Sequence, residues 1–309
     1  MKQTVALLGS PGAGKSSVGL SYPGVEQHVF GSSEETTALN FSARKDVTIP
    51  YKRDWYDMLT DVERAKFTDE KVSETELGVL MATARTRNII KYRRYLYQLK
   101  YEFSLGKPVM RKNAEGEEFE LKTIFLDNGT PFSDDFQDYV KMVYAKEFET
   151  KEGNYNSIAF SIKYKAEIAD FLRMMTEISP KLNVVASFHI AMTLDEANAA
   201  KADFMKDTAK GVRYPKEWQP MLYGQAKYVL PGIFDYVYFL WVKENPGQAN
   251  QYVAKLEADD STVGIAKSRL QPFDNPREIM FPKNHMHDFF TNAINEYLAS
   301  GKPSASKSK

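Results

Sequence analysis

The hydrophobic residues of this chain are grouped in short apolar runs that are separated by longer polar stretches. Continuous apolar segments end in polar or glycine-rich turns at Thr4–Leu8, at Lys122–Thr130 and at Asn183–His189. Runs of this length are typical of buried strands. The pattern predicts further strands at 27–35, 234–242 and 251–258.

Helical periodicity lies between these runs. Apolar side chains recur at three- and four-residue intervals in one charged stretch, at Ile89, Tyr92, Leu96, Leu99 and Phe103. This spacing predicts an amphipathic helix. Further helices are expected at 15–20, 158–178 and 287–300, and the turn signals in 106–122 favour a hairpin.

The alternation of strands and helices predicts an α/β fold with a mostly parallel sheet flanked by helices. Later strands are expected to pair antiparallel. With 309 residues the chain has room for one large domain or two small ones. We expect a single domain over 1–299, with a largely helical insertion at about 45–121 and a disordered tail at 300–309.

Composition narrows the classes of protein to consider. The formal net charge is zero, so the chain as a whole is no polycation, and nucleic-acid binding would need a local basic patch. The absence of cysteine excludes disulfides, thiolate metal sites and a cysteine nucleophile. No apolar run approaches the roughly 18 residues that span a bilayer. We therefore expect a cytoplasmic protein with no membrane partner.

A glycine-rich loop follows the first predicted strand in "LLGSPGAGKSS". Gly9, Gly14, Lys15 and Ser16 satisfy the pattern G-x-x-x-x-G-K-[ST]. In such loops backbone N–H groups point at phosphate oxygens, the lysine reaches the β/γ phosphates and the hydroxyl ligates magnesium. The expected nucleotide-binding residues are Gly9, Pro11, Gly12, Ala13, Gly14, Lys15, Ser16 and Ser17.

Polar side chains at later strand ends complete the candidate site. Asp127 follows an apolar strand and is the expected magnesium carboxylate beside Ser16. Either Glu34 or Glu35 can polarise a water for hydrolysis, and we favour Glu34. His189 is predicted at a strand end on the same sheet edge, where it can sense a phosphate.

This order of motifs resembles the RecA-like ATPase core. More narrowly, it resembles the phage-type RecA-like ATPases that accompany single-strand annealing and recombination. The matching segments are "GSPGAGKSS", the strand with Glu34, "TIFLDN", "VVASFH" and 220–242 with Gly224, Pro231 and Asp235. A basic "KSR" follows. The resemblance covers roughly 1–45 and 120–275, and the segment between them is longer than that family leads one to expect.

The resemblance implies ATP and Mg²⁺ as ligands and roles for particular residues. Asp127 would hold the magnesium, Glu34 would be the catalytic glutamate and His189 would sense the γ-phosphate. Lys267 and Arg269 match basic residues that reach a neighbouring subunit's nucleotide, which implies a homo-oligomer, a ring or a filament. Because eight residues precede Gly9, we also expect no separate domain before the core.

Two segments are candidates for contact with single-stranded DNA. The predicted helix at 85–101 is the most basic stretch of the chain, with tyrosines between its cations. Tyr92 belongs to its apolar stripe, which favours an ordinary core helix with solvated charges. The rival is 201–214, with Lys206, Lys210 and Arg213.

The combined prediction is an Mg-dependent ATPase that acts on single-stranded DNA in phage-type recombination, annealing or replication. It would work with other replication or recombination proteins. One alternative is an ATPase that loads or drives a helicase. Another is a small-molecule or nucleotide kinase, in which Lys91, Arg93 and Arg94 would form a lid. A third alternative is a protein that binds nucleotide as a conformational switch without hydrolysing it.

Overall fold

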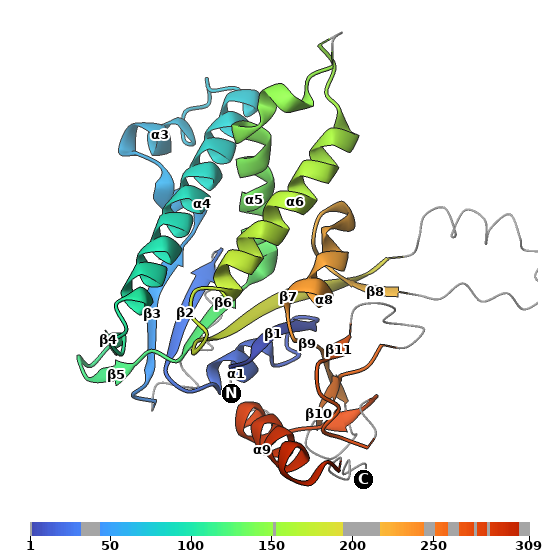
Figure 1. Cartoon of the computed structure of the whole chain (residues 1–309). Helices are drawn as coiled ribbons and strands as arrows, with labels where there is room; N and C mark the ends of the chain where they lie inside the picture. Colours follow the sequence, from blue (N-terminus) through green and yellow to red (C-terminus); the bar gives the residue numbers. More distant parts are fainter. Residues whose placement is uncertain are drawn as a thin grey trace, which may run out of the picture.

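A ten-stranded sheet forms the centre of the molecule (Figure 1). The computed structural model describes residues 2–31, 44–150, 153–193, 217–243, 251–258, 266–274, 277–282 and 285–302. The strands of the sheet are β1 (Thr4–Gly9), β2 (Val25–Phe30), β3 (Val47–Arg53), β6 (Thr123–Asp127), β7 (Asn183–Thr193), β8 (Glu217–Pro220), β9 (Tyr236–Lys243), β10 (Gln251–Lys255), β11 (Lys267–Ser268) and β12 (Ile279–Met280).

The strand order is β12-β10-β9-β1-β7-β6-β2-β3, with β11 beside β9 and β8 beside β7. From β9 to β3 each neighbouring pair is parallel, whereas β8, β10, β11 and β12 pair antiparallel. The α/β fold class with a mostly parallel sheet is therefore confirmed. Because β1, β7 and β6 are neighbours that run parallel, their carboxyl ends point to the same edge of the sheet.

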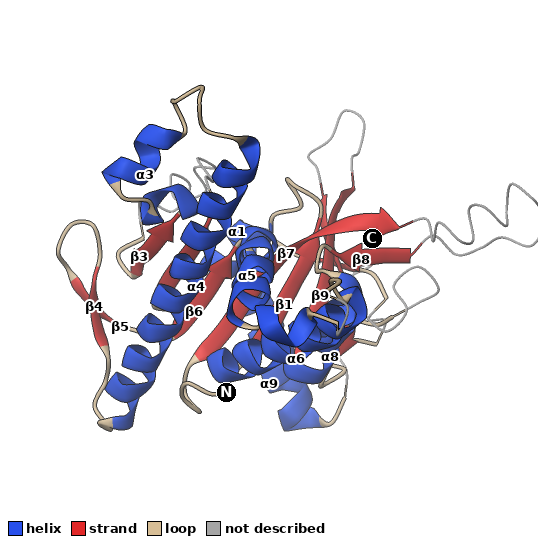
Figure 2. Ribbon diagram, turned by 90° about the horizontal axis from the view of Figure 1, so that it is seen from above, coloured by secondary structure: helices blue, strands red, loops and turns tan. Residues whose placement is uncertain are grey.

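Helices cover both faces of the sheet (Figures 1 and 2). On one face lie α4 (Glu74–Ser104), α5 (Gly129–Val143) and α6 (Ser157–Thr176), and on the other α1 (Lys15–Leu20) and α9 (Met286–Ser300). Shorter helical segments are η1 (Trp55–Met58), α3 (Asp61–Lys66), η2 (Ala145–Phe148), η3 (Gly224–Val229) and α8 (Leu230–Ile233). Among the helices of the described ranges, none is both long and apolar enough to cross a membrane.

The central strands are buried on both faces. Ala6 and Leu8 of β1 pack into the core beneath α4, α5 and α6, whereas Val5 and Leu7 pack into the core on the α1 and α9 side. Successive side chains of a strand point to opposite faces, so a strand covered on both faces is apolar throughout. This explains the continuous apolar runs in the sequence.

The segment at about 45–121, expected as a helical insertion, contributes to the same core. Its strand β3 extends the main sheet beside β2, and its helix α4 packs against α5. The predicted hairpin is present as β4 (Met110–Lys112) and β5 (Glu118–Glu120), which pair antiparallel. Whether the segment is an insertion relative to other proteins stays a prediction, as do the domain limits.

Most predicted strands have somewhat different bounds in the structure, and the differences matter most for β2 and β7. β2 begins at Val25 and ends at Phe30, because Gly31 turns the chain with a φ of 85°. β7 continues past His189 to Thr193, so the prediction that His189 ends this strand is wrong. The closing helix α9 ends at Ser300, and 303–309 of the predicted tail lie outside the described residues.

Candidate functional site

The glycine-rich loop connects β1 to α1 at the carboxyl edge of the sheet. Gly12 and Gly14 have φ values of 79° and 85°, a region that side chains with a Cβ rarely adopt. A Cβ at Gly9 would lie 2.6 Å from the Leu240 carbonyl oxygen of β9. The pattern of glycines is thus required by the turn and by close packing. Within the loop, the Ala13 N–H donates to the Ser10 carbonyl at 3.2 Å.

The predicted nucleotide-binding residues differ in exposure. Pro11 and Gly12 are exposed at the tip of the loop, and Gly14 and Ser16 are half-buried. Buried members of the set are Gly9, Ala13, Lys15 and Ser17. The structure therefore brings these residues together in one turn, with the exposed backbone at its tip.

Lys15 lies at the centre of this loop. Its Nζ donates to the carbonyl oxygens of Gly9 and Ser10, both at 2.9 Å, and lies 3.2 Å from Nδ1 of His189. An ammonium group can only donate, so Nδ1 accepts and the neutral ring carries its proton on Nε2. Two residues that are 174 positions apart in the chain thus share one hydrogen bond.

The sheet register places His189 beside the loop. Gly9 of β1 is the neighbour of His189 in β7, so His189 reaches the loop although its strand does not end there. The Thr130 hydroxyl, from the first turn of α5, accepts a hydrogen bond from the His189 N–H at 3.0 Å. This bond links the start of α5 to the backbone of β7.

Asp127 is the last residue of β6 and is held by two neighbouring strands. Its Oδ2 accepts a hydrogen bond from Nε2 of Gln27 at 2.8 Å, and its Oδ1 accepts one from the Ser187 hydroxyl at 2.7 Å. Gln27 comes from β2 and Ser187 from β7, so the strands on either side of β6 orient the carboxylate.

Each of the four residues Asp127–Thr130 makes a different contribution to the structure of the site. The Asn128 side chain caps α5 by accepting from the Thr130 N–H at 2.8 Å. A Cβ at Gly129 would lie 2.3 Å from the ring of Phe188, so only glycine allows α5 to start this close to β7. The carboxylate, the cap and the contact with His189 are all built from four consecutive residues.

Asp127 and Ser16 carry hard oxygen atoms of the kind that Mg²⁺ prefers as ligands. Mg²⁺ usually keeps several waters and binds one or two protein oxygens together with substrate phosphates. Within the described ranges no group of three or more histidine, aspartate or glutamate side chains is gathered for a metal. The donor set thus fits Mg²⁺ bound together with a nucleotide and does not resemble an all-protein metal cage.

Glu34 lies in 32–43, outside the described residues, as does its neighbour Glu35. β2 runs parallel to β6, with Val29 opposite Asp127, so β2 ends on the edge that carries the carboxylate. The predicted position of Glu34 near a bound phosphate remains a prediction.

Lys267 and Arg269 lie at the other end of the sheet. Lys267 is paired with Val237 near the start of β9, where its Nζ donates to the carbonyl oxygens of Pro231 at 2.5 Å and Phe234 at 3.2 Å. Arg269 is 68% exposed and pairs with Asp235 at 3.1 Å. Neither cation approaches the loop of its own chain, and contact with a neighbouring subunit's nucleotide remains a prediction.

The basic helix predicted at 85–101 is the second half of α4, and its cations fall into two groups. Arg85 pairs with Asp138 at 3.0 Å and Arg87 with Glu63 at 2.8 Å. Arg93 donates to the Tyr139 hydroxyl at 2.9 Å. In the ranges that the structure covers, the cations without an ion pair are Lys91, Arg94 and Lys100. The rival DNA segment at 201–214 lies outside those ranges.

Sequence reasoning missed the residues that hold the others in place. Ser187 is fully buried in an apolar stretch of β7, and Gln27 is 5% exposed in β2, between the buried polar residues Glu26 and His28. A polar side chain within a buried strand needs a hydrogen-bond partner. That signal was present in "VVASFH" and "VEQHVF", but the sequence does not reveal that the partner of both is Asp127.

Comparison with known proteins agrees with this arrangement. A family model described as an AAA domain matches residues 1–270. The matched range includes the glycine-rich loop, Asp127, His189 and Arg269. A search of curated proteins found no match to this sequence.

Proposed function

The chain belongs to the AAA domain family of P-loop ATPases, and we propose that it is an Mg-dependent ATPase that acts on single-stranded DNA in phage-type recombination, annealing or replication. The observation that carries the proposal is the meeting of Lys15, His189 and Asp127 at one edge of the sheet. Each is held there by contacts from a different part of the chain.

ATP would bind with its phosphates in the loop. The backbone N–H groups of the exposed loop tip would face the phosphate oxygens, and Lys15 would supply a positive charge at the β/γ phosphates. Ser16 and Asp127 would hold the metal, which neutralises the charge that develops on the phosphates. Gln27 and Ser187 would keep the Asp127 carboxylate in one orientation during this binding.

His189 is suited to report on the γ-phosphate. Its ring accepts a hydrogen bond from Lys15, while its backbone is bonded to Thr130. A phosphate that takes over the lysine ammonium would remove this hydrogen bond from Nδ1, so the ring would respond to the bound phosphate. Glu34 remains the proposed activator of the attacking water, by the resemblance of its strand.

We propose further that the protein works as a homo-oligomer in which Arg269 contacts the nucleotide of a neighbouring subunit. The position of Arg269 supports this proposal, because it is exposed at the end of the sheet opposite the loop of its own chain. An arginine supplied in trans stabilises the charge of the transition state in phosphoryl transfer.

The proposed DNA task is tested by ATP hydrolysis with and without single-stranded DNA, in the wild type and Lys15→Ala. We expect DNA to raise the rate of the wild type and Lys15→Ala to show no stimulated rate. A hydrolysis rate that is the same with and without DNA would contradict the DNA task but not the proposed ATPase activity. Phosphorylation of a small acceptor without any DNA effect would favour the kinase.

A further inference from the structure

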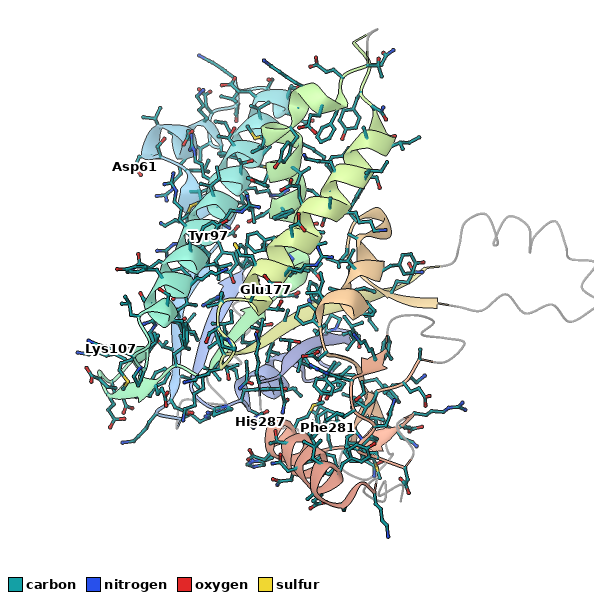
Figure 3. All side chains as sticks on the ribbon, viewed as in Figure 1. Asp61, Tyr97, Lys107, Glu177, Phe281 and His287 are labelled. Atoms are coloured by element: carbon teal, nitrogen blue, oxygen red, sulfur yellow. The ribbon has the colours of Figure 1, made fainter. Side chains whose placement is uncertain are left out.

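The outward side of α4 carries aromatic and cationic side chains that the core does not use. Arg94, Tyr97 and Tyr101 follow one another at three- and four-residue spacing, so they share one face of the helix. At about 100° per residue, Lys91 and Lys100 lie on opposite sides of this face, each about 90° around the helix from it. We call these five residues the α4 stripe. Tyr97 and Tyr101 are 55% and 63% exposed, whereas Tyr92, one turn before, is fully buried. Figure 3 shows Tyr97 on α4 and Lys107 beyond its end.

The charges of the α4 stripe are not neutralised by the rest of the described chain. Neighbouring arginines of α4 have acidic partners within 4.0 Å, but the three cations of the stripe have none there. Two acidic groups that line a pocket together with Arg94, Glu26 and Glu102, both pair with Arg111.

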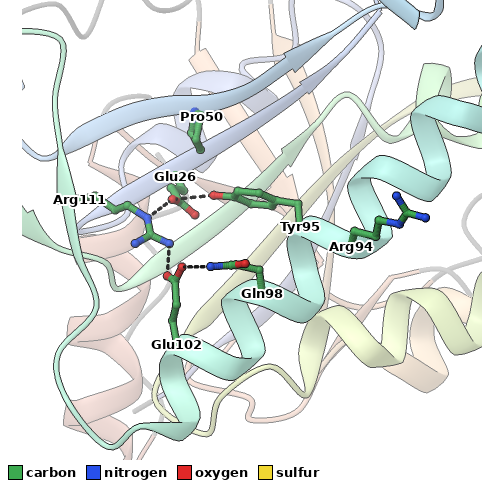
Figure 4. A pocket seen from close by; sticks show the side chains of 7 residues that line it. All are labelled: Glu26, Pro50, Arg94, Tyr95, Gln98, Glu102 and Arg111. Atoms are coloured by element: carbon green, nitrogen blue, oxygen red, sulfur yellow. Dashed lines mark hydrogen bonds and ion pairs between the residues drawn. The ribbon is translucent and has the colours of Figure 1, made fainter.

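A cavity of about 550 Å³ lies beside the stripe, lined by Glu26, Pro50, Arg94, Tyr95, Gln98, Glu102 and Arg111. In Figure 4 the Arg94 side chain points away from the hydrogen-bonded network of Glu26, Arg111 and Glu102. No hydrogen bond or ion pair of the described residues joins Arg94 to this network, so its guanidinium donors remain available.

We propose that the α4 stripe is a binding surface for a single-stranded polynucleotide. Lys91, Arg94 and Lys100 would contact phosphates, and the rings of Tyr97 and Tyr101 would stack on bases. The inference rests on the proposed DNA task and assigns it to a helix separate from the nucleotide loop. Stacking on exposed rings needs unpaired bases, which favours a single strand over a duplex.

The dimensions and chemistry of the stripe agree with this occupant. From Lys91 to Tyr101 the helix rises about 15 Å, a length along which a few unpaired nucleotides can lie. The stripe presents tyrosines and unpaired cations and few aliphatic side chains. Since the chain has no net charge, a polyanion would be attracted to this local excess of positive charge and not to the molecule as a whole.

The test is the binding of a labelled oligothymidylate, followed by fluorescence anisotropy over a series of salt concentrations. The double variant Tyr97→Ala/Tyr101→Ala should bind about 100-fold more weakly. Its matched control, Tyr97→Phe/Tyr101→Phe, keeps both rings and should bind within about twofold of the wild type.

A second set of variants tests the cations. In Lys91→Ala/Arg94→Ala/Lys100→Ala, the slope of log affinity against log salt should become shallower by about 2, since each phosphate contact contributes about 0.7 for a single strand. The control Lys71→Ala/Lys181→Ala removes exposed lysines elsewhere and should leave the slope unchanged. Thermal unfolding by circular dichroism should be the same for all variants, because these side chains are exposed.

If the stripe variants bind oligothymidylate with the affinity and salt slope of the wild type, the inference is overturned, while the proposed DNA task stands. A wild type that binds no oligothymidylate at low salt would overturn both. If the stripe variants instead change the sedimentation of the protein without changing DNA binding, the stripe is an interface between copies of the chain, and the inference is again wrong.

Discussion

Asp127 shows how single side chains decide the chemistry of this site. Its carboxylate accepts one hydrogen bond from Gln27 and one from Ser187, and these bonds fix the direction of its remaining lone pairs. Partners that orient a ligand commonly matter 10- to 100-fold for metal affinity. If Asp127 is the magnesium ligand as proposed, Ser187 is a positioning residue, because it acts through Asp127.

Ser187→Ala should therefore raise the Mg²⁺ concentration needed for half-maximal ATP hydrolysis by about 10-fold. The rate at saturating Mg²⁺ should change less. The measurement is a Mg²⁺ titration of hydrolysis. Ser133→Ala is the matched control, since Ser133 is also buried and bonded to another side chain, the Tyr164 hydroxyl at 2.7 Å. Equal Mg²⁺ dependence in both variants would contradict the role of Ser187.

At this scale the sequence predicted the residue types but not their partners. The motif around Lys15 and the strand-end Asp127 were both identified in advance. The contact between Lys15 and His189 depends on the register of β1 against β7, which no local pattern encodes. The same is true of the bonds from Gln27 and Ser187 to Asp127.

The start of α5 packs so closely against β7 that there is no room for a side chain at Gly129. A Cβ at Gly129 would lie 2.3 Å from the Phe188 ring and 2.8 Å from the Ser187 carbonyl oxygen. Gly78 of α4, by contrast, has no atom within 4 Å of a Cβ added there. The two glycines are both helical and differ in what surrounds them.

Gly129→Ala should lower the free energy of unfolding by about 1–3 kcal/mol, the usual cost of inserting a methyl group into a packed core. Gly78→Ala should raise it by about 0.5–1 kcal/mol, because alanine is the better helix former at an open position. Urea unfolding of both variants measures the difference. Equal effects in the two would show that α5 does not pack against β7 as described.

The contact between α4 and α5 makes stability depend on pH. Burial raises the pKa of Asp135 to about 7, against the opposing effects of a hydrogen bond from Asn88 and the charge of Arg85. Between about pH 4 and pH 7 the native state then holds a proton that the unfolded chain releases. The free energy of unfolding should therefore fall as pH rises through this range.

Asp135→Asn should flatten this part of the stability curve, because an amide does not titrate. In the wild type, Asp135 should lower the free energy of unfolding by up to about 1.4 kcal/mol per pH unit, and the substitution should abolish this contribution. Urea unfolding at a series of pH values measures it. The control Asp170→Asn, at a carboxylate that is 73% exposed, should keep the wild-type slope. A wild-type slope in Asp135→Asn would contradict the raised pKa.

Among the elements, the sequence predicted the central strands and the helices α1, α4, α6 and α9. It missed the helix α5, the strand β3 and shorter strands such as β8, β11 and β12. β1 and α1 agree with the predicted ranges to within a residue, because an apolar run and a glycine-rich turn bound them. β3 was not predicted. It lies at the edge of the sheet and contains Pro50, beside an irregularity in its register with β2. Proline is tolerated in such edge strands but weakens their sequence signal.

At the scale of the whole molecule, the proposed trans contact makes activity depend on assembly. If Arg269 completes a neighbour's site, the ATPase rate per chain should rise with protein concentration. Arg269→Ala should lower that rate by at least about 10-fold, by analogy with other arginines supplied in trans. Rates proportional to enzyme at all concentrations, with an unaffected Arg269→Ala, would contradict the contact.

The whole-molecule prediction was correct in class because alternating strands and helices leave few arrangements for a sheet covered on both faces. It did not foresee that the segment after β2 would join the sheet and the core. The partners of Tyr51 and Tyr92 in that core come from distant elements, so only the assembled fold shows them.

The central claim is that the loop around Lys15 binds ATP for hydrolysis. Its most direct test is the steady-state rate of ATP hydrolysis with Mg²⁺ by the purified wild type, Lys15→Ala and the exposed control Lys181→Ala. The account predicts equal hydrolysis by the wild type and Lys181→Ala and only background hydrolysis by Lys15→Ala. A Lys15→Ala protein that hydrolyses ATP at the wild-type rate, or a wild type that hydrolyses none, would contradict it.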